Sequence, residues 1–316
     1  MRTPKASRVS FGETIAKLGD KHPEIVVLEA DLAKSTYSYL FGEKFPDRYF
    51  EMGIAEANMI GTGSGLALAG KTAYICSFAC FVTGRYDIIR MSIAYPKANV
   101  RIIGTHAGIA IGDDGNSQQG LEDISIMRSL PNMAVIQPVD DMEAEQAIEY
   151  SVKHKGPMFI RLTRQKLEPI NSDNYRFQFG KGVTLKEGKD LTIIATGGVV
   201  YNALQAAYHL DKEGVSCGVI NIHTIKPIDK ELIIKAARET RRLVTVEDHN
   251  IIGGLGSAVS EVISEHYPVH LRRIGLNDCF GESGDPAELY QKHGLDIAGI
   301  QKTVKDFIKE NQSVLS

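Results

Sequence analysis

The chain has 316 residues, of which 43% are hydrophobic and 24% are charged, and its formal net charge is −3. These values are typical of a globular protein of about two domains, and they argue against nucleic acid or a membrane surface as a partner. No apolar run reaches the roughly 18 residues that span a bilayer, and the opening MRTPKASRVS lacks the apolar core of a signal peptide. We therefore expect a cytoplasmic protein.

The first half of the chain alternates strand-like runs with helical patterns. The strand-like runs are short, continuous and rich in β-branched residues, as is typical of strands buried on both faces. They cover 25–30, 72–78, 100–104, 133–138 and 158–162. The clearest helix is 140–156, which has acidic residues at its start, apolar residues at helical spacing, and Lys then Gly at its end. This pattern predicts a first domain, residues 1–170, built on a parallel α/β sheet.

A polar stretch without periodicity follows and predicts a linker over 171–190. A second α/β series comes after it and predicts a further domain over 191–316. Strands are expected at 191–196, 215–221, 242–247 and 269–275. Helices are expected near 199–213, 229–239, 255–266, 285–292 and 296–310, with Asp229 as an N-cap. The predicted fold class is therefore α/β, with two consecutive parallel-sheet domains.

An ionisable residue, Glu56, stands at the head of a run that is otherwise small and apolar, residues 55–69. The run contains Gly61, Gly63 and Gly65, and each glycine costs about 1 kcal/mol inside a helix. We expect close approach of another helix to compensate, and a sheet and a subunit interface to cover the two sides. Glu56 is either a first-turn acid that the helix dipole favours, or a buried carboxylate that shares a proton with a ligand nitrogen.

Further polar and aromatic groups follow the predicted strands. Phe78 and Phe81 are either core residues or a ligand-binding pair. The loop 105–123 is long, polar and glycine-rich, as is typical of ligand sites at the carboxyl ends of strands, although a solvated loop is the alternative. Arg161 lies near the end of the strand 158–162 and Arg164 follows it, in positions where an arginine clamps a phosphate or carboxylate, or forms a surface ion pair.

Two other features have a structural interpretation. The scattered cysteines, Cys76, Cys80, Cys217 and Cys279, predict reduced and buried thiols and not a structural zinc site. The turn EDHNIIGGLGSA, residues 247–258, opens a predicted helix with glycines and is similar to a phosphate cradle. We interpret it as a site of tight packing.

Taken in order, several segments resemble the C-terminal portion of transketolase, over essentially the whole chain. They are RYFEMGIAEANM, SFACF, THAGIAIGDDGNSQQGLED, LPNMAVIQPVDDMEA and FIRLTRQ. The resemblance implies a thiamine diphosphate pyrimidine-binding domain followed by a smaller transketolase C-terminal-like domain. It also implies transfer of a two-carbon ketol unit from a ketose phosphate to an aldose phosphate.

The resemblance assigns cofactor-binding roles to four residues. Glu56 matches the glutamate that hydrogen-bonds a ring nitrogen of the aminopyrimidine and so activates the cofactor, a role for which a dry carboxylate is suited. Phe78 and Phe81 match aromatic residues that pack on this flat ring. Asp31 matches a residue that lines the cofactor region.

The resemblance also assigns a substrate site. His106 matches a catalytic histidine that contacts sugar hydroxyl or phosphate oxygens, and Asp114 matches an acid that contacts the hydroxyl next to the acceptor aldehyde. Arg164, Ser35 and Arg8 match phosphate contacts. Gln118 stands where many microbial and plant members carry a second sugar-binding histidine, so hydrogen bonding remains there but imidazole acid–base chemistry does not. Gly84 stands where many members have an aromatic residue near the pyrimidine, so substrate preference is not carried over.

The chain lacks the GDG motif with which this family binds Mg²⁺ and the cofactor diphosphate. The resemblance therefore implies that this chain holds no metal and that an N-terminal transketolase subunit supplies the Mg²⁺ and diphosphate site. We expect a heterotetramer of two such chains and two partners, active only as an assembly.

Three alternatives remain open from the sequence. A beta subunit of a 2-oxo acid dehydrogenase has the same two domains and the same glutamate, but the loop 105–123 favours sugar phosphates. A 1-deoxyxylulose-5-phosphate synthase is normally one long chain. A non-catalytic scaffold subunit could retain the fold without turnover.

Overall fold

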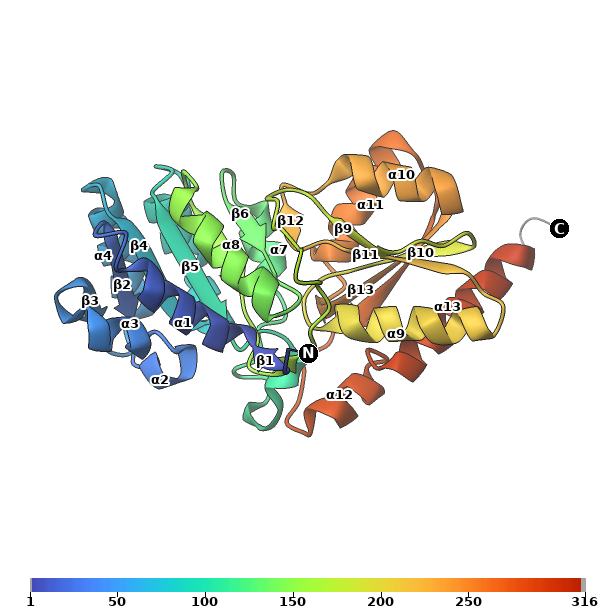
Figure 1. Cartoon of the computed structure of the whole chain (residues 1–316), viewed down its shortest axis with the longest axis horizontal. Helices are drawn as coiled ribbons and strands as arrows, with labels where there is room; N and C mark the ends of the chain where they lie inside the picture. The colour runs from blue at the N-terminus through green and yellow to red at the C-terminus, as the bar shows by residue number, and fades with distance from the viewer. Residues whose placement is uncertain (1, 314–316) are drawn as a thin grey trace.

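The computed structural model describes residues 2–313 and has two α/β units side by side along the long axis of the molecule (Figure 1). The first is built on a seven-stranded sheet with the order β12-β6-β7-β5-β4-β2-β3, and the second on a five-stranded sheet with the order β14-β13-β10-β11-β9. Within each sheet all neighbouring strands are parallel except at one edge, where β12 and β9 run antiparallel to their neighbours. The predicted fold class is confirmed.

The five strands predicted for the first sheet are all present, and two edge strands join them. The predicted strands are β2 (Ile25–Glu29), β4 (Thr72–Phe78), β5 (Val100–Thr105), β6 (Ala134–Ile136) and β7 (Met158–Arg161). The added strands are β3 (Tyr49–Glu51) and β12 (Thr224–Lys226), the latter from the second half of the chain. A separate pair joins β1 (Lys5–Ala6) to β8 (Lys166–Leu167).

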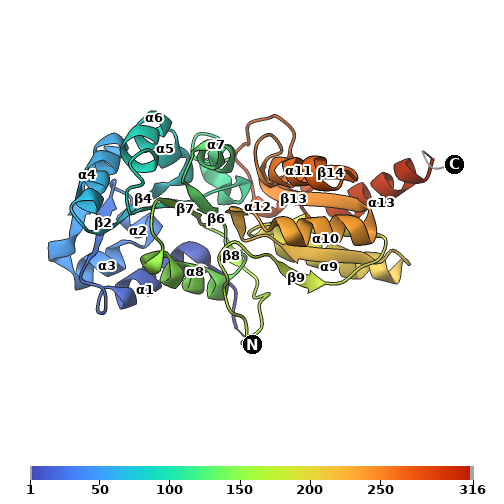
Figure 2. The ribbon, with the colours of Figure 1, turned by 90° about the horizontal axis from the view of Figure 1, so that it is seen from above.

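Helices cover both faces of the first sheet (Figure 2). One face packs against α1 (Ser7–Leu18), α3 (Tyr39–Lys44) and α8 (Asp141–Lys153); the other packs against α4 (Glu56–Leu68), α5 (Ala79–Thr83), α6 (Tyr86–Ile88), a π-helical segment (Ile89–Ala94) and α7 (Asp123–Ser129). Short helices also occur at α2 (Ala33–Thr36), Pro46–Arg48 and Ile109–Asp114.

Because alternate residues of a strand point to opposite faces, Val26 and Leu28 join one apolar core while Ile25 and Val27 join the other.

The second sheet contains the four predicted strands and one more. They are β9 (Val183–Lys186), β10 (Leu191–Ala195), β11 (Cys217–Asn221), β13 (Arg242–Asn250) and β14 (His270–Leu276). Its helices are α9 (Val199–Lys212), α10 (Lys230–Thr240), α11 (Leu255–His266), α12 (Pro286–Lys292) and α13 (Ile297–Ser313). Asp229 caps α10 as predicted, because its carboxylate accepts a hydrogen bond from the Leu232 amide at 3.2 Å.

The two units are joined by more than one connection. Strand β9 lies inside the segment 171–190 and pairs with β11, so that segment carries one strand of the second sheet. Strand β12 crosses in the opposite direction and pairs with β6 of the first sheet. The division into residues 1–170, 171–190 and 191–316 stays a prediction.

The glycines of α4 meet different surroundings from those expected. A Cβ atom on Gly63 would lie 2.6 Å from Cγ2 of Ile75, so the close neighbour is strand β4 and not another helix. Cβ atoms on Gly61 and Gly65 would meet nothing within 4 Å. The face of α4 that carries them is bordered by exposed apolar side chains, among them Ile54 (82% exposed). Gly63 therefore allows close approach of strand β4 and not of a helix, whereas the outer face of α4 is open in the single chain and the expected subunit interface there stays a prediction.

The cysteine prediction holds for two of the four residues. Cys76 and Cys217 are buried, whereas Cys80 is half-buried and Cys279 is exposed, and all four are free thiols. Cys279 lies in the loop between β14 and α12, where no strand or helix pattern could have fixed its burial. Within residues 2–313, no helix is both long and apolar enough to cross a membrane, and no three His, Cys, Asp or Glu side chains form a candidate metal site.

Candidate active site

The predicted site residues gather at the carboxyl edge of the first sheet. The strands β7, β5, β4, β2 and β3 are adjacent and parallel, so the residues that follow them meet at one edge. Asp31 and Ser35 follow β2, Glu56 follows β3, Phe78 ends β4, His106 follows β5, and Arg164 follows β7. Arg8, in the first turn of α1, reaches the same region from the N-terminal segment.

Glu56 is the first residue of α4 and is 6% exposed, so the predicted burial of this residue is confirmed. In the part of the chain that the structure describes, its carboxylate forms no hydrogen bond and no ion pair. A buried acid is ordinarily satisfied by partners within its own chain. This one instead keeps its acceptor oxygens free for a group outside the chain.

Three flat side chains form a stack beside the sheet edge. The ring centroids of Phe78 and Phe81 are 5.5 Å apart with an interplanar angle of 11°, and the centroids of Phe78 and His106 are 3.7 Å apart at 23°. Phe78 lies between Phe81 and His106 in this stack. The resemblance assigns the two phenylalanines to the cofactor and His106 to the sugar. This stack presents an aromatic surface suited to a flat heterocyclic ring.

His106 is held in an unusual backbone conformation and in its neutral form. Its φ is +57°, a left-handed conformation that non-glycine residues seldom adopt and that marks sites of functional constraint. Nε2 accepts from Nη1 of Arg8 at 3.1 Å, so the ring proton lies on Nδ1, 2.9 Å from the Thr105 hydroxyl. Burial, with the charges of Arg8 and Arg164, lowers the pKa of His106 to about 3. The imidazole is therefore a neutral hydrogen-bonding group at physiological pH.

The guanidinium of Arg8 lacks a neutralising carboxylate. Its Nη1 donates to the Ser35 carbonyl at 2.7 Å, its plane lies over the Tyr37 ring at 5.3 Å, and its buried Nε has no partner. Burial and the charge of Arg164 lower the pKa of Arg8, which shows that the two cations feel each other. Among the described residues no ion pair satisfies Arg8, so this corner of the site attracts an anion.

The long loop places Asp114 opposite Arg164. Nη1 of Arg164 lies 3.2 Å from Oδ2 of Asp114 and donates to the Ile111 carbonyl at 2.9 Å, and both charged side chains are partly exposed. Gln118 is half-buried, and its backbone carbonyl accepts from the Cys80 thiol at 3.2 Å. No hydrogen bond of the Gln118 side chain joins it to another predicted residue within the described chain. The structure therefore pairs Asp114 with Arg164 and leaves the Gln118 amide free.

Two carboxylates that the sequence analysis did not single out support the site. Glu51 accepts from the amides of Asp31 (2.8 Å) and Gly53 (3.0 Å), which ties the β2 loop to the segment before Glu56. Glu29 is fully buried and accepts from the hydroxyls of Thr36 and Ser38, both at 2.6 Å, so it anchors the loop that carries Asp31 and Ser35. A carboxylate that ends an otherwise apolar strand was the available signal for Glu29.

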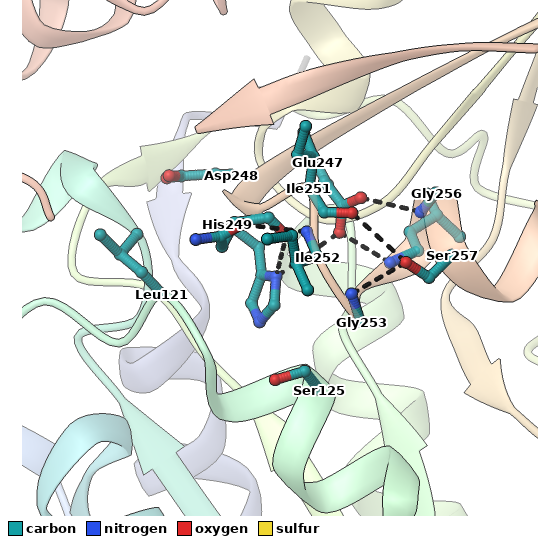
Figure 3. Close-up of polar contacts among 12 residues, drawn as sticks. Leu121, Ser125, Glu247, Asp248, His249, Ile251, Ile252, Gly253, Gly256 and Ser257 are labelled. Atoms are coloured by element: carbon teal, nitrogen blue, oxygen red, sulfur yellow. Dashed lines mark hydrogen bonds and ion pairs between the residues drawn. The ribbon is translucent and has the colours of Figure 1, made fainter. Parts of the chain in front are cut away.

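The glycine-rich turn of 247–258 is filled by the chain itself. Figure 3 shows the Glu247 carboxylate pointing at the start of α11, where it accepts from the amides of Leu255 (2.6 Å) and Gly256 (2.8 Å). A Cβ atom on Gly254 would lie 2.0 Å from Oε2 of Glu247. The interpretation as tight packing is confirmed, since an internal carboxylate takes the place that a phosphate would occupy.

Arg161 has neither of the roles considered for it. It is buried, and its guanidinium forms an ion pair with Asp123 at 2.7 Å, besides donating to the carbonyls of Gly120 (2.8 Å) and Asp248 (2.9 Å). The pair is therefore neither a surface ion pair nor a clamp for a ligand, because it is buried inside the first unit, where Arg161 also donates to the Asp248 carbonyl of the second unit.

Replacement of Glu247 by Gln should make stability less dependent on pH. Burial raises the pKa of Glu247 to about 7 from the ordinary 4.5. Because the folded state binds this proton more tightly than the unfolded state, Glu247 adds to the free energy of unfolding below pH 4.5. This contribution is lost as the pH rises through 7. Urea unfolding measured from pH 5 to pH 8 should therefore show that the wild type loses free energy of unfolding, relative to Glu247→Gln, as the pH rises. Glu261→Gln, at an exposed site on α11, the helix that Glu247 caps, should show no such trend, and a flat difference for Glu247→Gln would contradict the assignment.

A cavity of about 640 Å³ lies outside this site, between β8, α9, α12 and α13. Its walls include Gln165, Tyr201, Tyr290 and Gln301, and none of the residues predicted for the active site. The chemistry-bearing residues instead lie on the open edge of the first sheet. We therefore take that edge, and not the cavity, as the candidate active site.

Comparison with known proteins gives a consistent assignment over both units. Residues 3–169 match the family model described as transketolase, pyrimidine binding domain, and residues 180–300 match transketolase, C-terminal domain. A putative transketolase C-terminal section from Methanocaldococcus jannaschii is 47% identical over 97% of both chains. A 6-deoxy-6-sulfo-D-fructose transketolase subunit from a Clostridium species is 41% identical over 95% of this chain and 93% of that protein.

A solved structure extends the likeness to three dimensions. The structure described as a split gene transketolase, inactive beta4 tetramer, superposes with a TM-score of 0.90 at 44% identity, over 96% of this chain and 99% of that chain. The two family-model matches together cover most of the chain, and the Methanocaldococcus jannaschii relative is 47% identical over nearly its whole length. The chain therefore belongs to the transketolase family, of which it carries the pyrimidine-binding and C-terminal domains.

Proposed function

We propose that the chain is the C-terminal subunit of a thiamine diphosphate-dependent transketolase that moves a two-carbon ketol unit from a ketose phosphate to an aldose phosphate. The observation that carries the proposal is Glu56, a buried carboxylate without an internal partner, at the same sheet edge as an aromatic stack and an unneutralised arginine. Glu56 has no partner within the described chain, and Arg8, although it donates to the Ser35 carbonyl and to His106, has no carboxylate to neutralise its charge.

The residues present fit the pyrimidine half of thiamine diphosphate. Glu56 would accept a hydrogen bond from a ring nitrogen of the aminopyrimidine, and the burial of its side chain limits the water around the carboxylate. Phe78 and Phe81 would pack against the flat ring, and Asp31, held by Glu51, would line the cofactor region. When bound, the cofactor supplies the carbon nucleophile that takes up the ketol unit.

The cationic side of the site fits a sugar phosphate. Arg8 and Arg164 provide the charge for a phosphate, and Ser35 lies beside Arg8. His106 would bind sugar oxygens as a neutral group, with Nε2 as the acceptor nitrogen and the ring proton on Nδ1. Asp114, held by Arg164, is placed to accept a hydrogen bond from an acceptor hydroxyl, and the unpaired Gln118 amide offers a further contact.

A partner chain would complete the site. The sequence has no GDG motif, and the described residues contain no cluster of candidate metal ligands, so the Mg²⁺ and diphosphate would be held by an N-terminal transketolase subunit. The open face of α4, with Gly61 and Gly65, is suited to close approach of a second copy of this chain. Relatives named as a C-terminal section and as a split gene transketolase support this arrangement.

Ketol transfer should depend on that partner. With saturating thiamine diphosphate and Mg²⁺, this chain alone should give no transfer from xylulose 5-phosphate to ribose 5-phosphate, and addition of an N-terminal subunit carrying GDG should restore it. Pyruvate in place of the ketose phosphate tests the 2-oxo acid dehydrogenase alternative, and 6-deoxy-6-sulfofructose tests the substrate named for the Clostridium relative. Full activity of the isolated chain would contradict the split-site proposal, and absence of any transfer by the assembly would contradict the activity.

A further inference from the structure

The second domain contacts the loop that carries Asp114. We call residues 105–123 the sugar loop. Its Ile109 amide donates to Oδ1 of Asp248 at 2.9 Å, and the Asn250 amide donates to the Leu121 carbonyl at 2.9 Å. Figure 3 shows Asp248 and Glu247 pointing in different directions from β13, so one residue caps α11 while the next reaches the sugar loop.

A second contact comes from the loop between β14 and α12 and from α12 itself. The hydroxyl of Tyr290 donates to Oδ2 of Asp248 at 2.9 Å and also contacts Gln165. Nε2 of Gln119, inside the sugar loop, donates to the Glu282 carbonyl at 3.0 Å. Asp248 thus has one carboxylate oxygen on the sugar loop and the other on α12.

Glycines allow these segments to approach closely. A Cβ atom would lie 2.1 Å from Oδ2 of Asp248 if placed on Gly108, 2.3 Å from the Ser283 hydroxyl if placed on Gly115, and 1.9 Å from Oε1 of Gln119 if placed on Gly281. Gly108 and Gly115 also have φ of +85° and +74°, which other residues rarely adopt. At each of these three glycines, the missing side chain therefore lets the sugar loop and the second domain come into close contact.

The clamped part of the loop is the part that reaches the substrate side of the site. Ile109 follows His106 by three residues, and the turn that begins there contains Ile111 and Asp114, the two partners of Arg164. A shift of this turn would move Asp114 and Arg164 together. A displacement of about 1 Å in positioning groups is enough to weaken productive binding.

We infer that Asp248 and Tyr290 are positioning residues through which the C-terminal domain orients the sugar loop and so sets affinity for the phosphorylated acceptor. This role rests on the proposed function. The geometry requires Tyr290 to act as a donor, and burial raises its pKa well above the ordinary value, so the hydroxyl keeps its proton at working pH.

Replacement of Tyr290 by Phe removes the donor to Asp248 with little change of shape. In the assembled enzyme, we expect KM for ribose 5-phosphate to rise roughly threefold to tenfold, the range that one hydrogen bond contributes, with kcat changed by less than about twofold. Amide hydrogen exchange across 105–123 of the chain should become faster, because the loop opens more often. Tyr208→Phe, at an exposed tyrosine of α9, is the matched control and should change neither quantity.

A second variant keeps the test decisive if Tyr290→Phe fails to fold. Asp248→Asn retains an acceptor for the Ile109 amide and alters the contact with Tyr290, so it should shift KM and exchange in the same direction. Unchanged KM and unchanged exchange in either folded variant would overturn the inference. Failure of the wild-type assembly to transfer ketol units would instead overturn the proposed function, while the exchange measurement would still report on the clamp.

Discussion

Glu56→Gln should reduce ketol transfer by about two to four orders of magnitude, the range that a positioned acid–base group contributes. The side chain is 6% exposed and has no partner within the described chain, so its carboxylate is free to interact with the cofactor ring. Glutamine keeps the shape and one acceptor oxygen but cannot carry the charge or share a proton. The measurement is kcat of the assembled enzyme with saturating cofactor, Mg²⁺ and sugar phosphates.

Two further measurements separate catalysis from folding. Gel filtration of Glu56→Gln with the partner subunit should give the wild-type assembly, since no internal contact is lost. Glu145→Gln, an exposed change on α8 of the same domain, should retain wild-type kcat. Normal turnover by Glu56→Gln would support the scaffold alternative and contradict a catalytic role for this residue.

The strands could be predicted because their signal is local, whereas one long helix could not. β2 has the continuous apolar sequence that burial on both faces requires, and any neighbouring strand would satisfy it. Helix α1 buries Ser10 and Thr14 beside Phe11 and contains Gly12, so its apolar period is obscured. A Cβ atom on Gly12 would lie 2.4 Å from the Tyr37 carbonyl, and no pattern within α1 contains that neighbour.

The site was predictable to the extent that it follows from strand order. Once five parallel strands are predicted, the residues after them meet at one edge, and the resemblance supplies their roles. The charge state of His106 was not predictable, because its pKa is lowered first by burial in the fold and then by Arg8, which is 98 residues away in sequence. The clamp on the sugar loop was missed for the same reason, since Asp248 and Ile109 are 139 residues apart.

For the buried ion pair between Arg161 and Asp123, we expect a large effect on stability. Arg161→Leu should lower the free energy of unfolding by about 3–5 kcal/mol, because it leaves the carboxylate of Asp123 buried without its counter-ion. Urea unfolding followed by circular dichroism at pH 7 measures the change. Lys235→Leu, which breaks the exposed pair with Glu239 on α10, is the control and should cost about 1 kcal/mol or less.

A double variant distinguishes the stranded charge from lost packing. In Arg161→Leu/Asp123→Leu no uncompensated charge remains, so the protein should be more stable than Arg161→Leu alone. The carbonyls of Gly120 and Asp248 lose their donor in both variants, and their contribution therefore cancels in the comparison. If the double variant is no more stable than the single one, the cost arises from these carbonyl contacts and not from the charge on Asp123.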